Sequence, residues 1–213
     1  MMRFWNRGNQ WNRWVRRGWK PGPLIALCLV AGCGSGQPED SGHPEDSGHP
    51  DWIQGDFPEE LPRPHYDVAT LQLAEREVVV EVAASSRGRS YGLMFVDELP
   101  EDRGMLFIYP APRPMSFWMR NTKIPLDIAF IAEFGEECRI MNVQADMRPF
   151  QEDPNYPSFG PCRFALELPG GWARRHGLKA GDPVLIPEEI RTMEVEPDKP
   201  RLRNLPRLIG PPE

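Results

Sequence analysis

The stretch SFWMRNTKIPLDIAF, residues 116–130, contains two strand-like apolar segments with a polar turn between them. In the first segment, Phe117 and Met119 alternate with more polar residues, as in a β-strand whose successive side chains point to opposite faces. Asn121 and Thr122 then predict a turn, because their side chains can satisfy nearby backbone groups. The stretch therefore predicts a domain in which β-strands meet at polar turns.

Two of the predicted strands each carry one carboxylate beside a small residue. Asp127 shares a strand face with Ala129, and Glu167 shares one with Ala165. If the two strands are neighbours in the sheet, both carboxylates converge with the polar turn on one cavity. The predicted ligand-binding residues are Trp118, Arg120, Asn121, Thr122, Asp127 and Glu167.

We expect this cavity to bind a small polar or glycan-like ligand, or part of a partner protein. An aromatic wall with a few convergent polar groups suits such a ligand. In a purely structural alternative, Asp127 caps the polar turn and pairs with Arg120. A carboxylate-pair hydrolase of the cell envelope is a second alternative, and it requires Asp127 and Glu167 to lie roughly 5–9.5 Å apart.

Methionines suggest a third alternative, a Cu(I) site, because soft thioether sulfur suits that ion. Methionine is also a flexible filler of apolar cores, and no histidine lies close by in the sequence. Motifs of nucleophilic catalysis, phosphate binding and dinucleotide binding are missing, so the sequence assigns no catalytic residue, cofactor or metal site. We therefore expect a binding module rather than an enzyme. The methionines in question are Met94, Met105, Met115, Met119, Met141 and Met147.

Further strands are predicted on both sides of the opening stretch by β-branched and alternating residues. Pro110 is expected to end one of them, and Met141, Val143 and Ala145 are expected to point inward from another. The predicted strands cover Val68–Leu73, Glu77–Val82, Gly104–Tyr109, Met115–Met119, Leu126–Ala132, Arg139–Ala145 and Arg163–Leu168.

Helical segments are few, and we expect them at Ser86–Val96 and at Gly171–His176. In the last predicted strand, Phe164, Leu166 and Leu168 share one face. The pattern predicts an α+β domain over residues 67–187 that is mostly antiparallel β. Its sheet should form a single compact curled-sheet or small barrel-like domain with one or two short helices.

Several ordered motifs in this region resemble a known family. They are Gly92–Phe95, Gly104–Phe107, Phe117–Thr122, Ile124–Asp127, Leu166–Leu168 and Gly177–Asp182. Over residues 70–187 the chain resembles domain-of-unknown-function family 192. The resemblance implies a compact β-rich domain that is often secreted, and it implies no established activity.

The N-terminal residues 1–32 are typical of a signal peptide, with a basic segment followed by a short apolar run. That run is shorter than the roughly 20 residues that a membrane-spanning helix needs. Leu29–Cys33 resembles the bacterial lipobox, which implies lipidation of Cys33 and a place in the cell envelope, on the periplasmic or outer-membrane side. An ordinary secretory signal is the alternative, and the pair Arg16 and Arg17 leaves open a twin-arginine export route.

Flanking segments of the domain have the composition of flexible chain. Residues 33–66 are rich in Pro, Gly and acidic residues and contain PEDSGH twice in tandem, so we expect a disordered tether. Residues 188–213 contain many prolines, so we expect a flexible tail.

Charge and cysteine content limit the function classes further. Residues 1–32 hold six basic and no acidic residues, which leaves 19 basic against 31 acidic residues and a net charge of −12. A chain with that charge has no global basic field for nucleic acid, and we expect no nucleic-acid partner. Cys138 and Cys162 remain after the signal, and they either pair in a disulfide or stay as two buried thiols.

Overall fold

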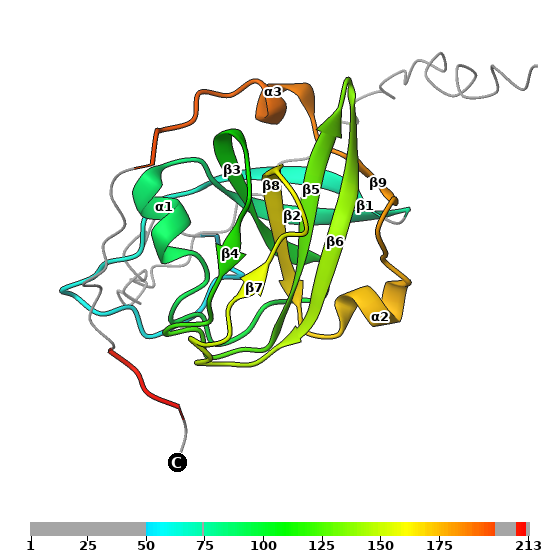
Figure 1. Cartoon of the computed structure of the whole chain (residues 1–213). Coiled ribbons are helices and arrows are strands. Elements are labelled where there is room, and N and C mark those ends of the chain that lie inside the picture. Colours follow the sequence, from blue (N-terminus) through cyan, green and yellow to red (C-terminus); the bar gives the residue numbers. More distant parts are fainter. Residues whose placement is uncertain (1–49, 74, 199–207, 212–213) are drawn as a thin grey trace, which may run out of the picture. The chain divides into compact units, whose positions relative to one another are not determined.

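Seven strands close into a barrel in the order β1-β2-β3-β8-β5-β6-β9 (Figure 1). Their bounds are Asp67–Leu73 (β1), Arg76–Ala83 (β2), Arg103–Arg113 (β3), Leu126–Phe134 (β5), Glu137–Met147 (β6), Cys162–Pro169 (β8) and Pro183–Leu185 (β9). Neighbours pair antiparallel, except that β2 and β3 run parallel, with helix α1 (Ser86–Tyr91) in their connection. The predicted α+β, barrel-like domain is thereby confirmed.

The computed structural model describes residues 50–73, 75–198 and 208–211. All of them belong to one compact unit, Pro44–Glu213. The predicted signal peptide, the predicted lipidation site Cys33 and the first part of the predicted tether lie outside the described residues. Within the described part of the chain, no helix has the length and apolar character needed to cross a membrane.

Alternation along β8 divides its side chains between two apolar clusters. Phe164, Leu166 and Leu168 share one face, as predicted, and belong to the cluster inside the barrel, which we call the barrel core. Ala165 points the other way, into a cluster that we call the outer layer. The central residues of β3, β5 and β8 are buried on both faces, which explains why these strands have nearly continuous apolar sequences.

The outer layer is completed by segments that lie outside the barrel. Phe117 comes from the short strand β4 (Ser116–Phe117), which pairs with β7 (Tyr156–Pro157) and is shorter than predicted. Its ring packs edge-on against Phe107 and Phe130, with centroids 5.0 and 5.8 Å away. The first half of the opening stretch therefore folds over the barrel, while the second half forms one of its strands.

Two local strand predictions are wrong, and irregular pairing explains both. In β6 a bulge at Met141 lets Ile140 point into the barrel, while Met141 packs against the outer layer. Ala145 is exposed, and only Val143 packs against the barrel core as predicted. Strand β3 continues past Pro110, at a place where its pairing with β8 is interrupted.

Local capping sets the helix lengths. The hydroxyl of Ser85 accepts a hydrogen bond from Gly88 N at the start of α1, and the helix ends at Gly92, whose φ is 56°. It is therefore shorter than the predicted Ser86–Val96. Helix α2 (Trp172–His176) ends at Gly177 with φ 66°, as the sequence predicts. Helices α1 and α2 lie on opposite sides of the barrel (Figure 1).

Cys138 and Cys162 do not form a disulfide, which corrects that possibility. Both are buried free cysteines. Cys138 belongs to the barrel core and Cys162 to the outer layer, so their side chains lie on different faces of the sheet. Burial raises the pKa of the Cys162 thiol to about 11, which keeps it protonated at neutral pH.

Both predicted flexible segments contain residues that pack on the domain. In the region assigned to the tether, Ile53 and Tyr66 are buried in the outer layer. In the region assigned to the tail, helix α3 (Glu188–Arg191) buries Ile190 against the barrel core. The folded domain therefore extends beyond residues 67–187 at both ends.

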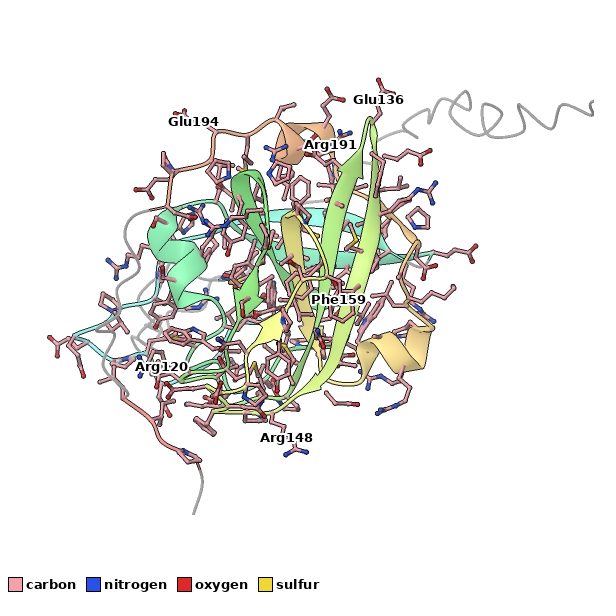
Figure 2. All side chains as sticks on the ribbon, viewed as in Figure 1. Arg120, Glu136, Arg148, Phe159, Arg191 and Glu194 are labelled. Carbon is pink, nitrogen blue, oxygen red and sulfur yellow. The ribbon has the colours of Figure 1, made fainter. Side chains whose placement is uncertain are left out.

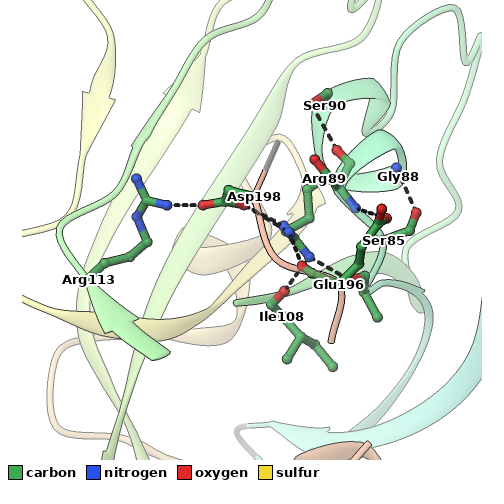
Figure 3. A network of polar contacts seen from close by, with 10 residues as sticks. Ser85, Gly88, Arg89, Ser90, Ile108, Arg113, Glu196 and Asp198 are labelled. Atoms are coloured by element: carbon green, nitrogen blue, oxygen red, sulfur yellow. Dashed lines mark hydrogen bonds and ion pairs between the residues drawn. The ribbon is translucent and has the colours of Figure 1, made fainter. Parts of the chain in front are cut away.

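Arg89, in α1, binds the segment that follows α3 (Figure 3). Its guanidinium donates to the carbonyls of Ala84 (2.5 Å), Ile108 (3.2 Å) and Glu196 (2.6 Å) and pairs with Asp198 at 2.8 Å. Asp198 also pairs with Arg113. A guanidinium presents five donors in a rigid fork, and here one buried arginine uses them to join a helix, a strand and the C-terminal segment.

Candidate functional site

The loop between β4 and β5, residues 118–125, presents Trp118 and Arg120 at the surface, where Arg120 meets Glu152 from another segment. The guanidinium of Arg120 lies 5.0 Å from the centroid of the Trp118 ring, within the range of a cation–π contact. Arg120 also pairs with Glu152 at 3.1 Å, and the two side chains are 17% and 29% exposed. Figure 2 shows Arg120 in the lower left of the view, away from Arg191 near the top. We call Trp118, Arg120 and Glu152 the loop surface.

Three residues with left-handed backbone conformations hold this loop. The φ angles are 66° at Phe95, 54° at Asn121 and 60° at Phe150. Phe95 N donates to Asn121 O (2.9 Å), and Phe150 N donates to Thr122 O (3.1 Å). Such conformations cost about 1–3 kcal/mol each at Phe95 and Phe150 and less at Asn121, since asparagine adopts them readily, and they cluster at binding and catalytic sites. The loop is thus fixed from two sides by strained backbone.

Asn121 and Thr122 are 1% and 5% exposed, so they support the loop from beneath its surface. The Asn121 amide Nδ2 lies 4.0 Å from Met94 Sδ, and its Oδ1 accepts from Ile209 N at 3.3 Å. The Thr122 hydroxyl donates to Arg120 O at 3.3 Å. Among the predicted ligand-binding residues, these two therefore lie next to Arg120 but face the protein.

Asp127 caps helix α2 rather than the polar turn. Its Oδ1 accepts from Gly171 N (3.0 Å) and Asp146 N (2.8 Å), and its Oδ2 accepts from Ala173 N (2.8 Å). Gly171, the residue at the N-terminal cap, has no side chain to do this. The sequence analysis offered a structural role for Asp127 as an alternative, and the structure shows such a role. The partner is the start of helix α2 and not Arg120.

Glu167 lies on the opposite face of the sheet. It pairs across the strands with Met105 and Ile128, which both belong to the outer layer, whereas Asp127 pairs with Leu168 of the barrel core. The two carboxylates therefore do not converge, and they do not form the catalytic pair that the hydrolase alternative requires. The prediction of one shared cavity is wrong because it assigned both acids to the same face.

Burial dominates the chemistry of Glu167. Desolvation raises the pKa of its carboxyl group to about 8, because a buried carboxylate loses its hydration. Glu167 is 4% exposed, and its raised pKa favours the protonated form at neutral pH.

A buried ion pair that the sequence did not indicate lies nearby on the same outer face. Arg63 donates to both carboxylate oxygens of Glu81 at 2.7 and 2.5 Å, and both side chains are fully buried. The guanidinium also lies 4.7 Å from the Tyr66 ring centroid, and burial raises the pKa of the Tyr66 hydroxyl above its usual range. The sequence analysis assigned Arg63 to the tether. The apolar residues Phe57, Leu61 and Tyr66 near it in the sequence are the signal that could have indicated a folded segment.

A family model matches this region of the chain. The family is DUF192, described as Uncharacterized ACR, and the match covers residues 69–186. The chain belongs to DUF192. The loop surface and both carboxylates of the predicted site lie inside the matched residues. The barrel strands also lie inside them, apart from Asp67 and Val68 at the start of β1.

Two solved structures resemble this DUF192 chain. One is a candidate transcription regulator from Sinorhizobium meliloti 1021, with 32% identity and a TM-score of 0.51 over 56% of this chain and 93% of that chain. The other is a protein of unknown function from Novosphingobium aromaticivorans DSM 12444, with 32% identity and a TM-score of 0.53 over 68% of this chain and 100% of that chain. No curated protein matches.

Methionines of the DUF192 domain lie in apolar surroundings. Met105, Met115, Met119 and Met147 belong to the outer layer, where a flexible thioether fills irregular space. Among the described residues, no three His, Cys, Asp or Glu side chains are grouped as metal ligands. That finding does not concern sulfur ligands of methionine, so the Cu(I) alternative stays a prediction.

Proposed function

We propose that this DUF192 protein is a lipid-anchored binding module of the cell envelope, and that the loop surface binds a glycan-like ligand. The observation that carries the proposal is the strained backbone at Phe95 and Phe150, whose N–H groups bond to the carbonyls of Asn121 and Thr122 in one loop. Backbone strain of this kind persists where the surrounding structure holds it, and it is frequent at ligand clamps.

Chemistry of the loop surface fits sugar hydroxyls and sugar rings. Trp118 is half-buried and offers apolar area, while Arg120 supplies N–H donors and Glu152 supplies carboxylate acceptors. The pair Arg120–Glu152 is already formed, so its groups are oriented before a ligand arrives. A few fixed polar groups beside an aromatic ring are the usual elements of such a site.

Location in the envelope rests on the sequence alone. The apolar run that ends at Cys33 resembles a lipobox, and a lipid at Cys33 would keep the domain at the membrane surface. Metabolic labelling with radioactive palmitate should mark the chain and fail to mark Cys33→Ser. Equal labelling of both proteins would refute the anchor.

Binding is tested with soluble muropeptides by isothermal titration calorimetry. We expect Trp118→Ala to weaken binding by at least about tenfold, which corresponds to about 1.4 kcal/mol. Arg120→Lys should weaken it less, since it keeps the charge but loses the planar stacking group. Phe159→Ala is the matched control, because Phe159 is a 73% exposed aromatic outside the loop surface.

Absence of heat with every muropeptide, or equal affinities for wild type and Trp118→Ala, would contradict the glycan proposal. The name of the Sinorhizobium meliloti relative suggests nucleic acid as another ligand. The net charge of −6 argues against it, and several surface arginines, such as Arg139 and Arg175, are paired with carboxylates.

A further inference from the structure

A third apolar cluster lies at the end of α1, separate from the barrel core and the outer layer. It consists of Tyr91, Met94 and Phe95, with the rings of Tyr91 and Phe95 5.8 Å apart. Leu208 and Ile209, near the C-terminal end of the chain, pack against it together with Phe57 and Leu61. We call Tyr91, Met94, Phe95 and Asn121 the tail-binding surface.

A polar contact accompanies this apolar packing. The backbone N–H of Ile209 donates to Asn121 Oδ1 at 3.3 Å. Asn121 is 1% exposed, and its amide also contacts Met94 Sδ, so the acceptor is held in a fixed position. One main-chain hydrogen bond beside two aliphatic side chains is how many domains recognise short peptide segments, because the backbone contact gives affinity and the apolar contacts give selectivity.

The DUF192 match includes the tail-binding surface but not the C-terminal segment that packs on it. The tail-binding surface lies within the DUF192 match at residues 69–186, whereas Leu208 and Ile209 lie outside it. The segment is also fastened upstream, where Glu196 and Asp198 bond to Arg89 (Figure 3). The chain therefore brings its own peptide to a surface that the family domain provides.

We propose that the tail-binding surface is a docking site for a peptide segment of a partner protein that carries two adjacent branched aliphatic residues, and that Leu208–Ile209 occupies it in cis. A ligand tethered in this way has an effective concentration on the order of millimolar. The tail thus sets the affinity that a partner must exceed. This proposal involves a different ligand class from the glycan proposal. The tail-binding surface shares Phe95 and Asn121 with the backbone support of the loop surface, but it contains neither Trp118 nor Arg120.

The test uses the full chain with Leu208→Ser and Ile209→Ser, which removes the aliphatic side chains of the tail. The probe is a fluorescein-labelled synthetic peptide with the sequence of residues 204–213, NLPRLIGPPE. We expect fluorescence anisotropy to show that the double variant binds the peptide at least about tenfold more tightly than the wild-type chain, whose tail competes. A peptide with the same two serines should not bind.

Asn121→Gly, added to the double variant, tests the polar contact. Glycine accepts the φ of 54° at this position without strain, so the change removes the acceptor and keeps the loop. We expect peptide affinity to fall by at least about fivefold, since one main-chain bond is lost. Asp146→Gly is the matched control, because Asp146 also has a positive φ, 55°, and lies outside the tail-binding surface.

Two outcomes would overturn the proposal: no peptide binding by a double variant that keeps the wild-type Tm, or equal peptide affinity in the double variant and the wild-type chain. Hydrogen exchange in the wild-type chain gives an independent measurement. Excess peptide should speed exchange at the Ile209 amide, and unchanged exchange would also refute displacement. Trp118→Ala should leave peptide binding unchanged, which separates this result from that of the glycan proposal.

Discussion

Asp127 and Glu167 occupy adjacent strands of one sheet, yet their surroundings are opposite. Asp127 points to the barrel side and accepts three backbone hydrogen bonds at the start of α2. Glu167 points to the outer face and has a pKa raised to about 8 by burial. The same sequence feature, a carboxylate beside a small residue, therefore caps a helix in one place and is a desolvated acid with a raised pKa in the other.

Removing the Asp127 carboxylate should have the largest effect on stability. Asp127→Ala leaves three backbone N–H groups without an acceptor. Since each such donor costs about 1–3 kcal/mol, we expect the free energy of unfolding to fall by at least about 3 kcal/mol in urea titration. Asp146→Asn is the control, because it changes only an exposed pair with Arg174 and should cost less than about 1 kcal/mol. Similar losses in both variants would show that Asp127 is not a cap.

Glu81 extends the comparison, since it shares the outer face with Glu167 but has a cation as partner. Glu81→Gln leaves the buried guanidinium of Arg63 uncompensated, and we expect a loss of about 3–5 kcal/mol in the free energy of unfolding. The paired change Arg63→Met with Glu81→Leu should recover most of that loss in the same urea titration. A double variant as unstable as Glu81→Gln would mean that the charges themselves stabilise the fold.

Glu167→Gln should change the pH dependence of stability. The folded pKa of about 8 lies above the ordinary value of 4.5, so the folded state binds the proton more tightly. Stability is then fully present below about pH 4.5 and decreases as the pH rises toward 8. We expect wild type to lose about 3 kcal/mol relative to Glu167→Gln between pH 5 and pH 8. Parallel pH profiles of the two proteins in urea titration would show that Glu167 is solvated.

A reductant should have the smallest effect on stability. Cys138 and Cys162 lie on different faces of the sheet, as Asp127 and Glu167 do, and form no disulfide. A disulfide across this loop would contribute roughly 3 kcal/mol, but both thiols are free. Dithiothreitol should therefore shift Tm by less than about 1 °C. Mass spectrometry of the alkylated, non-reduced chain should find both cysteines modified after unfolding, and a bridged peptide would contradict this.

Strand positions and the barrel class could be predicted because they depend on local alternation. In β8, the shared face of Phe164, Leu166 and Leu168 followed from period-two spacing, and the structure confirms it. The spacing in β5 also correctly separated Asp127 from Ile128. These relations exist within one strand and need no knowledge of its neighbours.

Choosing the inner face of each strand was not possible from the sequence. Both faces of β5 and β8 are buried, so apolar content does not distinguish inside from outside. In β5 the bulky face of Ile128 and Phe130 points to the outer layer, whereas in β8 the bulky face points into the barrel. For this reason the predicted convergence of Asp127 and Glu167 was wrong. Trp118 and Arg120, which lie in one loop, are in contact as the prediction required.

Helix α1 receives partners from far along the chain. Ser86 N bonds to the Glu196 side chain, 110 positions later, and Arg89 reaches Asp198 across 109. Contacts over such separations form late and slow folding. Helix α1 is therefore complete in its contacts only once the segment after α3 has been made. A chain shortened before Glu196 would leave the buried Arg89 guanidinium without its Glu196 and Asp198 partners.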